Sequence, residues 1–235
     1  MTQMNRTLVI MAKAPRVGSV KTRLAKSLPL QAVTELYRCL LNDTIALAQA
    51  LDGVEVAIMC PSSDVEEVSH AVAQTVCVVP QTGDGLAAGL DSVFAHFAAL
   101  GRRRIIAFNS DSPHLPASVL EAAFDLLATC DLVVGPTHDG GYYLVGGKAS
   151  HPGLFTSDGM GTASALEALH ERASHLQLTV RDLNPFYDID VAADLSQLAD
   201  ELQRIPGKAP RTAKWLSEWA STTPQPGQRR TDPST

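Results

Sequence analysis

The sequence predicts an α/β protein with a mostly parallel mixed sheet and helices on both faces. Short apolar runs alternate along the chain with longer amphipathic stretches, which is typical of βαβ units. Hydrophobic residues make up 45% of the chain and charged residues 19%, and this ordinary globular composition excludes a disordered protein. A length of 235 residues favours a single domain.

The apolar runs predict strands at residues 7–12, 54–60, 75–79, 104–108, 131–135 and 142–145. The amphipathic stretches predict helices at about residues 30–51, 64–73, 84–100, 116–128, 162–173 and 191–202. A last helix at residues 209–220 is expected to pack on the body. We expect the domain to cover residues 1–221, because residues 222–235 have no apolar periodicity and are expected to be a disordered tail.

Charge is distributed unevenly. The net charge of −6 argues against broad nucleic-acid binding, yet the first 34 residues hold six Lys and Arg and no Asp or Glu. One basic segment on an acidic body indicates a local anion site. The N-terminal apolar stretch is too short to span a membrane. The four cysteines lack the spacing of a zinc site, and we expect them to be free thiols. We therefore expect a cytoplasmic protein without a membrane partner.

The basic segment forms a loop after the first predicted strand. It contains Lys13, Arg16, Lys21 and Arg23 together with Gly18, and it leads toward a helix. Cations neutralise a phosphate, while backbone N–H groups and a helix N-terminus supply directional donors. The spacing excludes a P-loop. A solvated basic loop is the alternative, but the position after the first strand favours phosphate binding.

Carboxylates from two distant stretches could complete one metal site. Asp111 follows the fourth predicted strand, where it could hold a divalent cation that bridges substrate phosphates. Asp188 and Asp190 are two residues apart, so an extended backbone points both to one side, at a cost unless a cation lies between them. The alternatives are an Asx-turn at Asp111 and a helix cap at Asp190.

The segment after the fifth predicted strand contains the turn Asp139-Gly140-Gly141. Such a turn exposes N–H groups that could bind a substrate, but a plain hairpin turn has the same sequence pattern.

The glycine-rich residues 81–89 miss the dinucleotide fingerprint, which argues against an NAD site. The histidines show no metal-ligand spacing, and we expect those in the candidate loops, His114 and His138, to be surface imidazoles.

Taken in order, these motifs resemble a known family over about residues 7–200. They are MAKAPR (11–16) with VKTRLA (20–25), SDSPHLP (110–116), GPTHDGGYYLVG (135–146) and YDID (187–190). The resemblance is to bacterial GT-A-type transferases labelled glycosyltransferase-like or radical-SAM/selenodomain-associated. That family is similar to the 2-phospho-lactate and molybdenum-cofactor guanylyltransferases.

The resemblance implies a single Rossmann-like GT-A domain and assigns roles to residues. Nucleotide contacts would come from Ala12, Lys13, Arg16, Lys21, Arg23, Gly83 and Asp84. Mg²⁺ or Mn²⁺ would be held by Asp111, Asp188 and Asp190, and the acceptor would meet Asp139, Gly140, Gly141 and Tyr142. Relatives read Gly-Asp-Leu-Gly-x-Arg where residues 83–88 read GDGLAA, so an Arg expected near the base or ribose is missing.

The function hypothesis is a nucleotidyltransferase that moves NMP from an NTP to a small phosphorylated or phosphonate acceptor and releases pyrophosphate. Lys21, Arg23 and the metal held by Asp111 would be catalytic through positioning and charge neutralisation, and an anionic nucleophile needs no general base. One alternative is a glycosyltransferase that uses an NDP-sugar, with Asp139 as base. A second alternative is a non-catalytic nucleotide-binding module. The partners are thus a nucleotide and a small-molecule acceptor.

Overall fold

The computed structural model describes residues 5–72, 76–157 and 162–222. In this part of the chain one sheet has the strand order β3-β2-β1-β4-β6-β5-β7. All neighbouring strands are parallel except β6, which runs antiparallel to β4 and β5. The strands are β1 (Arg6–Met11), β2 (Val54–Cys60), β3 (Cys77–Pro80), β4 (Arg104–Asn109), β5 (Leu132–Pro136), β6 (Tyr142–Gly147) and β7 (Val180–Asp182).

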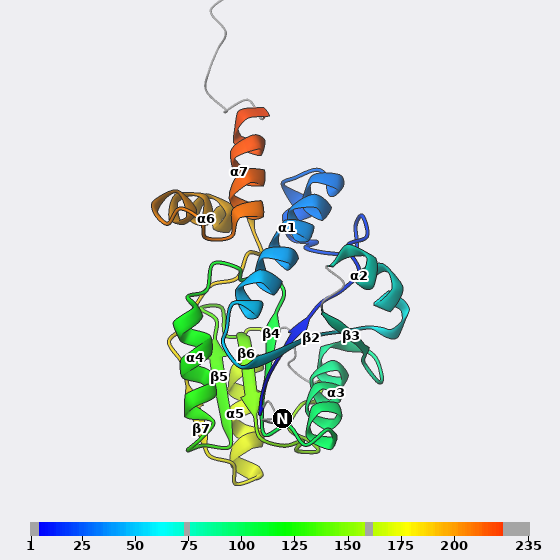
Figure 1. Cartoon of the computed structure of the whole chain (residues 1–235), viewed down its shortest axis with the longest axis vertical. Helices are drawn as coiled ribbons and strands as arrows, with labels where there is room; N and C mark the ends of the chain where they lie inside the picture. The colour runs from blue at the N-terminus through cyan, green and yellow to red at the C-terminus, as the bar shows by residue number, and fades with distance from the viewer. Residues whose placement is uncertain (1–4, 73–75, 158–161, 223–235) are drawn as a thin grey trace, which may run out of the picture.

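Helices cover both faces of this sheet (Figure 1). They are α1 (Leu30–Gln49), α2 (Val65–Ala71), α3 (Gly85–Ala99), α4 (Ala117–Leu126), α5 (Ala165–His175), α6 (Ala192–Arg204) and α7 (Pro210–Thr222). Two single-turn 3-10 helices, η1 (Leu24–Lys26) and η2 (Ser62–Asp64), lie in loops. No helix of the described residues has the length and apolar character needed to cross a membrane.

The structure confirms the predicted α/β class and each predicted strand and helix to within a few residues. Strand β7 was not predicted, because its three residues Val-Arg-Asp form no apolar run. Helix α7 continues to Thr222, and the expected disordered tail otherwise lies at residues 223–235, outside the described residues.

Two apolar layers hold the sheet between its helices. On one face, Tyr37 and Leu41 of α1 pack with Phe124 of α4 against strand residues such as Leu8. On the other face, α3 and α5 pack against the alternate strand residues, and Val9 belongs to this second layer. Successive side chains of a strand point to opposite faces, so strands buried on both sides are apolar throughout.

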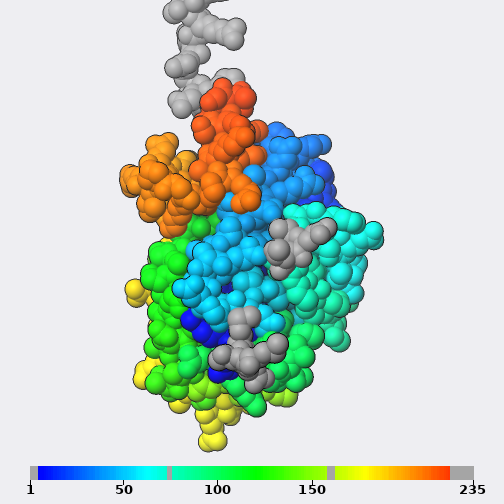
Figure 2. Space-filling model, in the orientation of Figure 1, coloured from blue at the N-terminus to red at the C-terminus, as the bar shows by residue number. Residues whose placement is uncertain are grey.

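A third apolar cluster joins α6 and α7 to α1 and η1. Figure 2 shows the red and orange surface of α7 against the blue surface of α1. Leu24 of η1 and Ile189, which precedes α6, are both fully buried in this cluster. Each lies beside predicted site residues, because Leu24 follows Arg23 and Ile189 separates the two C-terminal aspartates. The cluster therefore brings together segments that are distant in the sequence.

Asp43 of α1 fixes the start of α7. Its carboxylate is buried and accepts hydrogen bonds from the backbone N–H of Thr212 at 2.8 Å and from that of Arg211 at 3.4 Å. The guanidinium of Arg211 lies 3.2 Å from the same carboxylate. The first turn of a helix needs such acceptors, because its N–H groups have no partners within the helix.

We predict that Asp43→Ala lowers the free energy of unfolding by about 2 kcal/mol, since it leaves the buried N–H donors of α7 without an acceptor. Chemical denaturation measures this loss, and hydrogen exchange should show the largest loss of protection in α7. Asp52→Ala, at an exposed position after α1, is the matched control. A stability of Asp43→Ala equal to that of the control would contradict this role.

Candidate functional site

The candidate site lies where β1 and β4 end. These strands are parallel neighbours, and Met11 is paired with Asn109, so the loops that follow leave the sheet side by side. The chain continues from β1 to β2 on one side, while β6 pairs with β4 on the other. Ligands of open α/β sheets bind at such a switch point, beyond the carboxyl ends of the strands.

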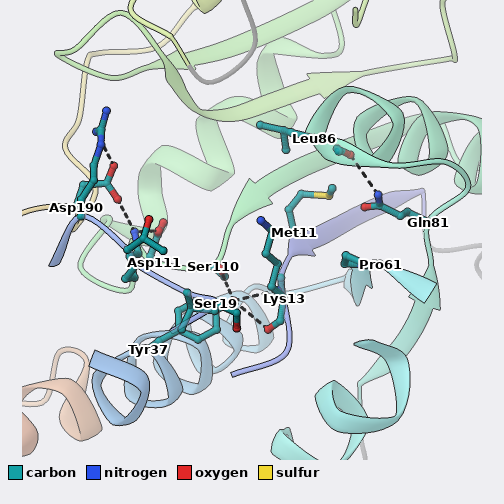
Figure 3. Close-up of a pocket in the computed structure, with 16 residues that line it drawn as sticks. Met11, Lys13, Ser19, Tyr37, Pro61, Gln81, Leu86, Ser110, Asp111 and Asp190 are labelled. Atoms are coloured by element: carbon teal, nitrogen blue, oxygen red, sulfur yellow. Dashed lines mark hydrogen bonds and ion pairs between the residues drawn. The ribbon is translucent and has the colours of Figure 1, made fainter. Parts of the chain in front are cut away.

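A pocket of about 560 Å³ opens at this point. Figure 3 shows side chains from the β1 loop, α1, the β4 loop and the segment before α6 around it. Its lining includes Ala12, Lys13, Ser19, Lys21, Arg23, Tyr37, Gln81, Leu86, Asp111 and Asp190. The structure thus brings three of the predicted cations and two of the predicted acids, from three separate motifs, to one cavity.

Lys21 connects the basic loop to the acids. Its ammonium forms ion pairs with Asp111 and with Asp190, the latter at 2.9 Å. Although burial disfavours the charged form, these two carboxylates raise the pKa of Lys21. Its backbone has φ +48°, a left-handed conformation that costs a non-glycine residue roughly 1–3 kcal/mol and concentrates at functional sites. Arg23 also reaches Asp190, at 3.1 Å.

Asp111, Asp188 and Asp190 form a group whose ligand oxygens lie within 4.8 Å of one another. Burial, followed by the charges of Asp111 and Asp190, raises the pKa of Asp188 to about 7. The Oδ1 atom of Asp111 is buried without a hydrogen-bond partner among the described residues. Lys21 therefore balances this charge only in part. An all-oxygen set with excess negative charge fits a hard divalent cation such as Mg²⁺ or Mn²⁺.

The start of α6 leaves Asp190 free to face the pocket. The carboxylate of Asp194 accepts the N–H groups of Asp190 at 2.8 Å and Val191 at 2.7 Å. Val191 is the N-cap of α6, and the Asp190 carboxylate pairs with Lys21 and Arg23, so the helix-cap interpretation of Asp190 is wrong.

Arg16 does not face the pocket as predicted. Its guanidinium lies 2.7 Å from Asp64 and 2.6 Å from Glu67, and it is absent from the pocket lining. Asp64 also accepts the backbone N–H of Ala14 at 2.8 Å. Although burial opposes ionisation, these hydrogen bonds lower the pKa of Asp64. Arg16 thus anchors the loop to the segment around α2.

The expected helix N-terminus is also absent from the basic loop. Only the single turn η1 follows Arg23, and α1 begins further on, at Leu30. The phosphate donors that a helix N-terminus would supply therefore do not come from this segment.

Tyr37 is a pocket residue that the sequence motifs did not include. Its hydroxyl accepts the backbone N–H of Lys13 at 3.1 Å and lies 3.2 Å from Ser110 Oγ, so it joins the β1 and β4 loops. Burial raises the pKa of Tyr37, which keeps the hydroxyl protonated. Tyr37 fits the buried face of helix α1, so the sequence pattern does not distinguish it from the core residues around it.

The glycine-rich segment contributes different residues from those predicted. Gly83 and Asp84 are exposed and do not line the pocket, whereas Gln81 and Leu86 do. The Gln81 side-chain amide donates to the carbonyl oxygens of Gly83 at 2.9 Å and Gly85 at 3.2 Å. Gln81 therefore orders this segment at the edge of the pocket.

A side pocket of about 320 Å³ adjoins the first and shares Arg23, Leu86 and Asp190 with it. The rest of its lining is Thr137, Asp139, Gly141, Tyr142, Thr162, Ala165 and Asp188. The predicted acceptor residues therefore lie together here, except Gly140, which does not line the side pocket.

Gly140 has a steric role in this turn. It has φ +87°, and a Cβ there would lie 1.9 Å from the carbonyl oxygen of Ala163.

The N–H groups of the Asp139-Gly140-Gly141 turn are not exposed as expected. Gly141 donates to Asp139 Oδ1 at 3.3 Å, and Gly140 donates to the carbonyl of Thr137 at 3.4 Å. Thr137 also donates its hydroxyl to Asp139 at 2.5 Å, and this hydrogen bond lowers the pKa of Asp139. The turn therefore presents an ionised carboxylate to the side pocket.

The expectation of a surface imidazole is wrong for His114 and confirmed for His138. His114 is fully buried, with its ring centroid 4.9 Å from that of Phe186 and 4.3 Å from that of Tyr187. Burial lowers the pKa of His114 to about 4, so the ring is neutral. It packs the loop that carries Asp111 against the segment before Asp188.

We predict that the affinity for Mn²⁺ falls by about tenfold per pH unit below pH 7, because protons compete for the Asp188 carboxylate, whose pKa is raised to about 7. Calorimetric titration with Mn²⁺ at several pH values measures this dependence. Asp188→Asn should bind Mn²⁺ weakly at every pH, without the step. A wild-type affinity that stays constant between pH 6 and 8 would be inconsistent with Asp188 as a ligand.

Comparison with solved structures finds the same fold in several proteins. A Desulfovibrio desulfuricans G20 protein, provisionally named a nucleotide-diphospho-sugar transferase, is 24% identical, with a TM-score of 0.85 over 92% of this chain and 96% of that one. A cytidylyltransferase from Leptospira borgpetersenii is 13% identical, with a TM-score of 0.56 over 93% of this chain and 96% of that one. These similarities establish a GT-A-like nucleotide-diphospho-sugar transferase fold.

No curated protein matches the sequence significantly. A family model described as "Uncharacterized protein conserved in bacteria (DUF2064)" matches residues 44–162, which include Asp111 and the Asp139 turn. The match covers just over half of the chain, and the protein therefore belongs to the DUF2064 family.

Proposed function

We propose that the protein is a metal-dependent transferase that moves NMP from an NTP to a small acceptor and releases pyrophosphate. An acceptor oxygen would form the new bond to the α-phosphorus, and the bond from that phosphorus to the leaving pyrophosphate would break. The proton of a hydroxyl acceptor would pass to Asp139. The observation that carries this proposal is the convergence of Lys13, Lys21 and Arg23 with Asp111 and Asp190 at one pocket, where Asp188 completes the carboxylate group from the adjoining side pocket. Polyphosphate binding needs such a combination of side-chain cations and a metal site. The name of one protein with this fold, a cytidylyltransferase, supports NMP transfer, and the provisional name of another, a nucleotide-diphospho-sugar transferase, supports a nucleotide substrate more generally.

In this proposal, different residues of the site bind different parts of the nucleotide. A divalent ion held by Asp111, Asp188 and Asp190 would neutralise charge on the phosphate oxygens. Lys21 and Arg23 adjoin these carboxylates and would bind the outer phosphates and the leaving pyrophosphate.

The nucleoside would lie toward the other side of the first pocket. Met11 and Gln81 line this region and supply apolar surface and an amide, and Leu86 lies at the boundary with the side pocket. Neither Gly83 nor Asp84 lines the pocket, so their predicted nucleotide contacts are not part of the proposal.

The proposal also does not include the phosphorylated or phosphonate acceptor that the sequence motifs suggested. An anionic acceptor in the side pocket would find Arg23 as its one cationic side chain among the described lining residues. That guanidinium already pairs with Asp190.

A second candidate is glycosyl transfer from an NDP-sugar, and the provisional name of the Desulfovibrio desulfuricans protein favours it. A hydroxyl acceptor needs a base, and Asp139 lines the side pocket as an ionised carboxylate. In that reaction the acceptor hydroxyl oxygen would form the new bond to the sugar, its proton would pass to Asp139, and the NDP would leave.

Product analysis separates the candidates. The protein is incubated with Mg²⁺ or Mn²⁺, each common NTP or NDP-sugar, and a mixture of small acceptors. We expect acceptor-dependent release of pyrophosphate from one NTP. Release of NDP from an NDP-sugar would establish the second candidate instead. Nucleotide binding without either product over a broad acceptor set would refute both reactions and favour a non-catalytic binding module.

We predict that Asp111→Asn weakens metal-dependent nucleotide binding by at least about tenfold, because it removes a metal ligand. The melting temperature should stay nearly unchanged, because loss of the ion pair with Lys21 is offset by relief of the repulsion from Asp188 and Asp190. Nucleotide titration at increasing Mg²⁺ measures the effect. Asp125→Asn, at an exposed position of α4, is the control. An Asp111→Asn protein whose magnesium dependence equals that of the control would exclude Asp111 as a ligand.

A further inference from the structure

The side pocket has a hydrogen-bonding character that limits what it can bind. This inference rests on the proposed function, in which the side pocket receives the acceptor. We propose that the acceptor is a non-anionic, hydroxyl-rich molecule of the sugar or polyol class, and that its hydroxyl groups donate to the carboxylates of the side pocket.

The charged lining is predominantly negative. Asp139, Asp188 and Asp190 supply three carboxylates, and Arg23 is the one cationic side chain among the described residues that line the pocket. Arg23 is bound to Asp190 at 3.1 Å, and its charge also acts on Asp139. A phosphate or carboxylate on the acceptor would therefore meet like charges with no uncommitted partner, which is unfavourable.

The backbone of the side pocket is equally poor in free donors. The N–H groups of Gly140 and Gly141 are used within their own turn. At the start of α5, Ala165 donates its N–H to the carbonyl of Thr162 at 3.1 Å. Anion sites depend on unpaired N–H groups at turns and helix starts, and these N–H groups are already paired.

Bound nucleotide makes the site more negative. The charges of Lys21, Arg23 and one divalent ion equal those of Asp111, Asp139, Asp188 and Asp190. The phosphates of an NTP or an NDP-sugar would then add negative charge that Lys13 offsets only in part. An acceptor that brings a further negative charge is disfavoured at the moment when both substrates are present.

The remaining lining suits the carbon skeleton of a polyol. Leu86 is 47% exposed at the boundary of the two pockets, and Tyr142 and Ala165 add apolar surface. Apolar walls combined with a few well-placed acceptors are typical of small-molecule sites. A sugar ring or polyol chain can place its C–H groups on these walls while its hydroxyl groups donate to Asp139 and Asp188.

Matched acceptor pairs test the proposal. Saturation-transfer NMR is recorded for glucose and glucose 1-phosphate, glycerol and glycerol 3-phosphate, and inositol and inositol 1-phosphate. Each spectrum is taken with and without an NTP or NDP-sugar and Mg²⁺. We expect stronger contact from the unphosphorylated member. Preference for the phosphorylated member, or no contact from any unphosphorylated member, would overturn the proposal. The proposed function fails separately, if no nucleotide binds in the presence of the metal.

Charge variants show whether the pocket sets this preference. Leu86→Lys adds a cation to the side pocket at an exposed position of α3, and Asp139→Lys replaces an anion with a cation. Each variant should raise the saturation-transfer signal of the phosphorylated member, relative to that of the unphosphorylated member, by about fivefold, which is the scale of an exposed charge pair. Leu100→Lys, at an equally exposed leucine beyond the other end of α3, is the control. If Leu86→Lys leaves the ratio at the control value, the side pocket does not select the acceptor.

Discussion

The mutual repulsion of three carboxylates is the constraint on which the rest of the site depends. Asp111, Asp188 and Asp190 come from two distant stretches and lie within 4.8 Å of one another, where like charges oppose their joint ionisation. Lys21 relieves this repulsion in part, at the cost of a left-handed backbone conformation. Such a backbone conformation persists only when the surrounding structure holds it. The three carboxylates keep an excess of negative charge, which a divalent cation can neutralise.

Apolar packing supplies the force that holds the carboxylates together. Leu24 and Ile189 are buried in one cluster, beside Arg23 and between the two aspartates. His114, packed on Phe186 and Tyr187, holds the β4 loop against the same segment. Helices α6 and α7, which lie beyond the sheet, thus help to fix the position of the acids.

Local pattern predicted the sheet and the location of the site, while partners distant in the sequence determined which residues face it. Alternating apolar runs located the strands, and loop positions after β1 and β4 identified Lys21 and Asp111. Arg16 has the same local signal as Lys21, but its partners Asp64 and Glu67 lie about fifty residues away and turn it from the pocket. Likewise, the local sequence did not show that the N–H groups of Gly140 and Gly141 form hydrogen bonds within their own turn.

The proposed function depends on one metal ion that binds both the protein carboxylates and the polyphosphate. Pulsed electron–nuclear double resonance on Mn²⁺ in the protein with a bound nucleotide tests this arrangement directly, because ³¹P coupling reports a phosphate oxygen on the ion. We predict one protein-bound Mn²⁺ with strong ³¹P coupling in the wild-type protein and, once unbound Mn²⁺ and nucleotide are removed, a loss of that signal when Asp188 is replaced by Asn. Strong coupling that persists in the Asp188→Asn protein, or a protein-bound Mn²⁺ without ³¹P coupling, would contradict it.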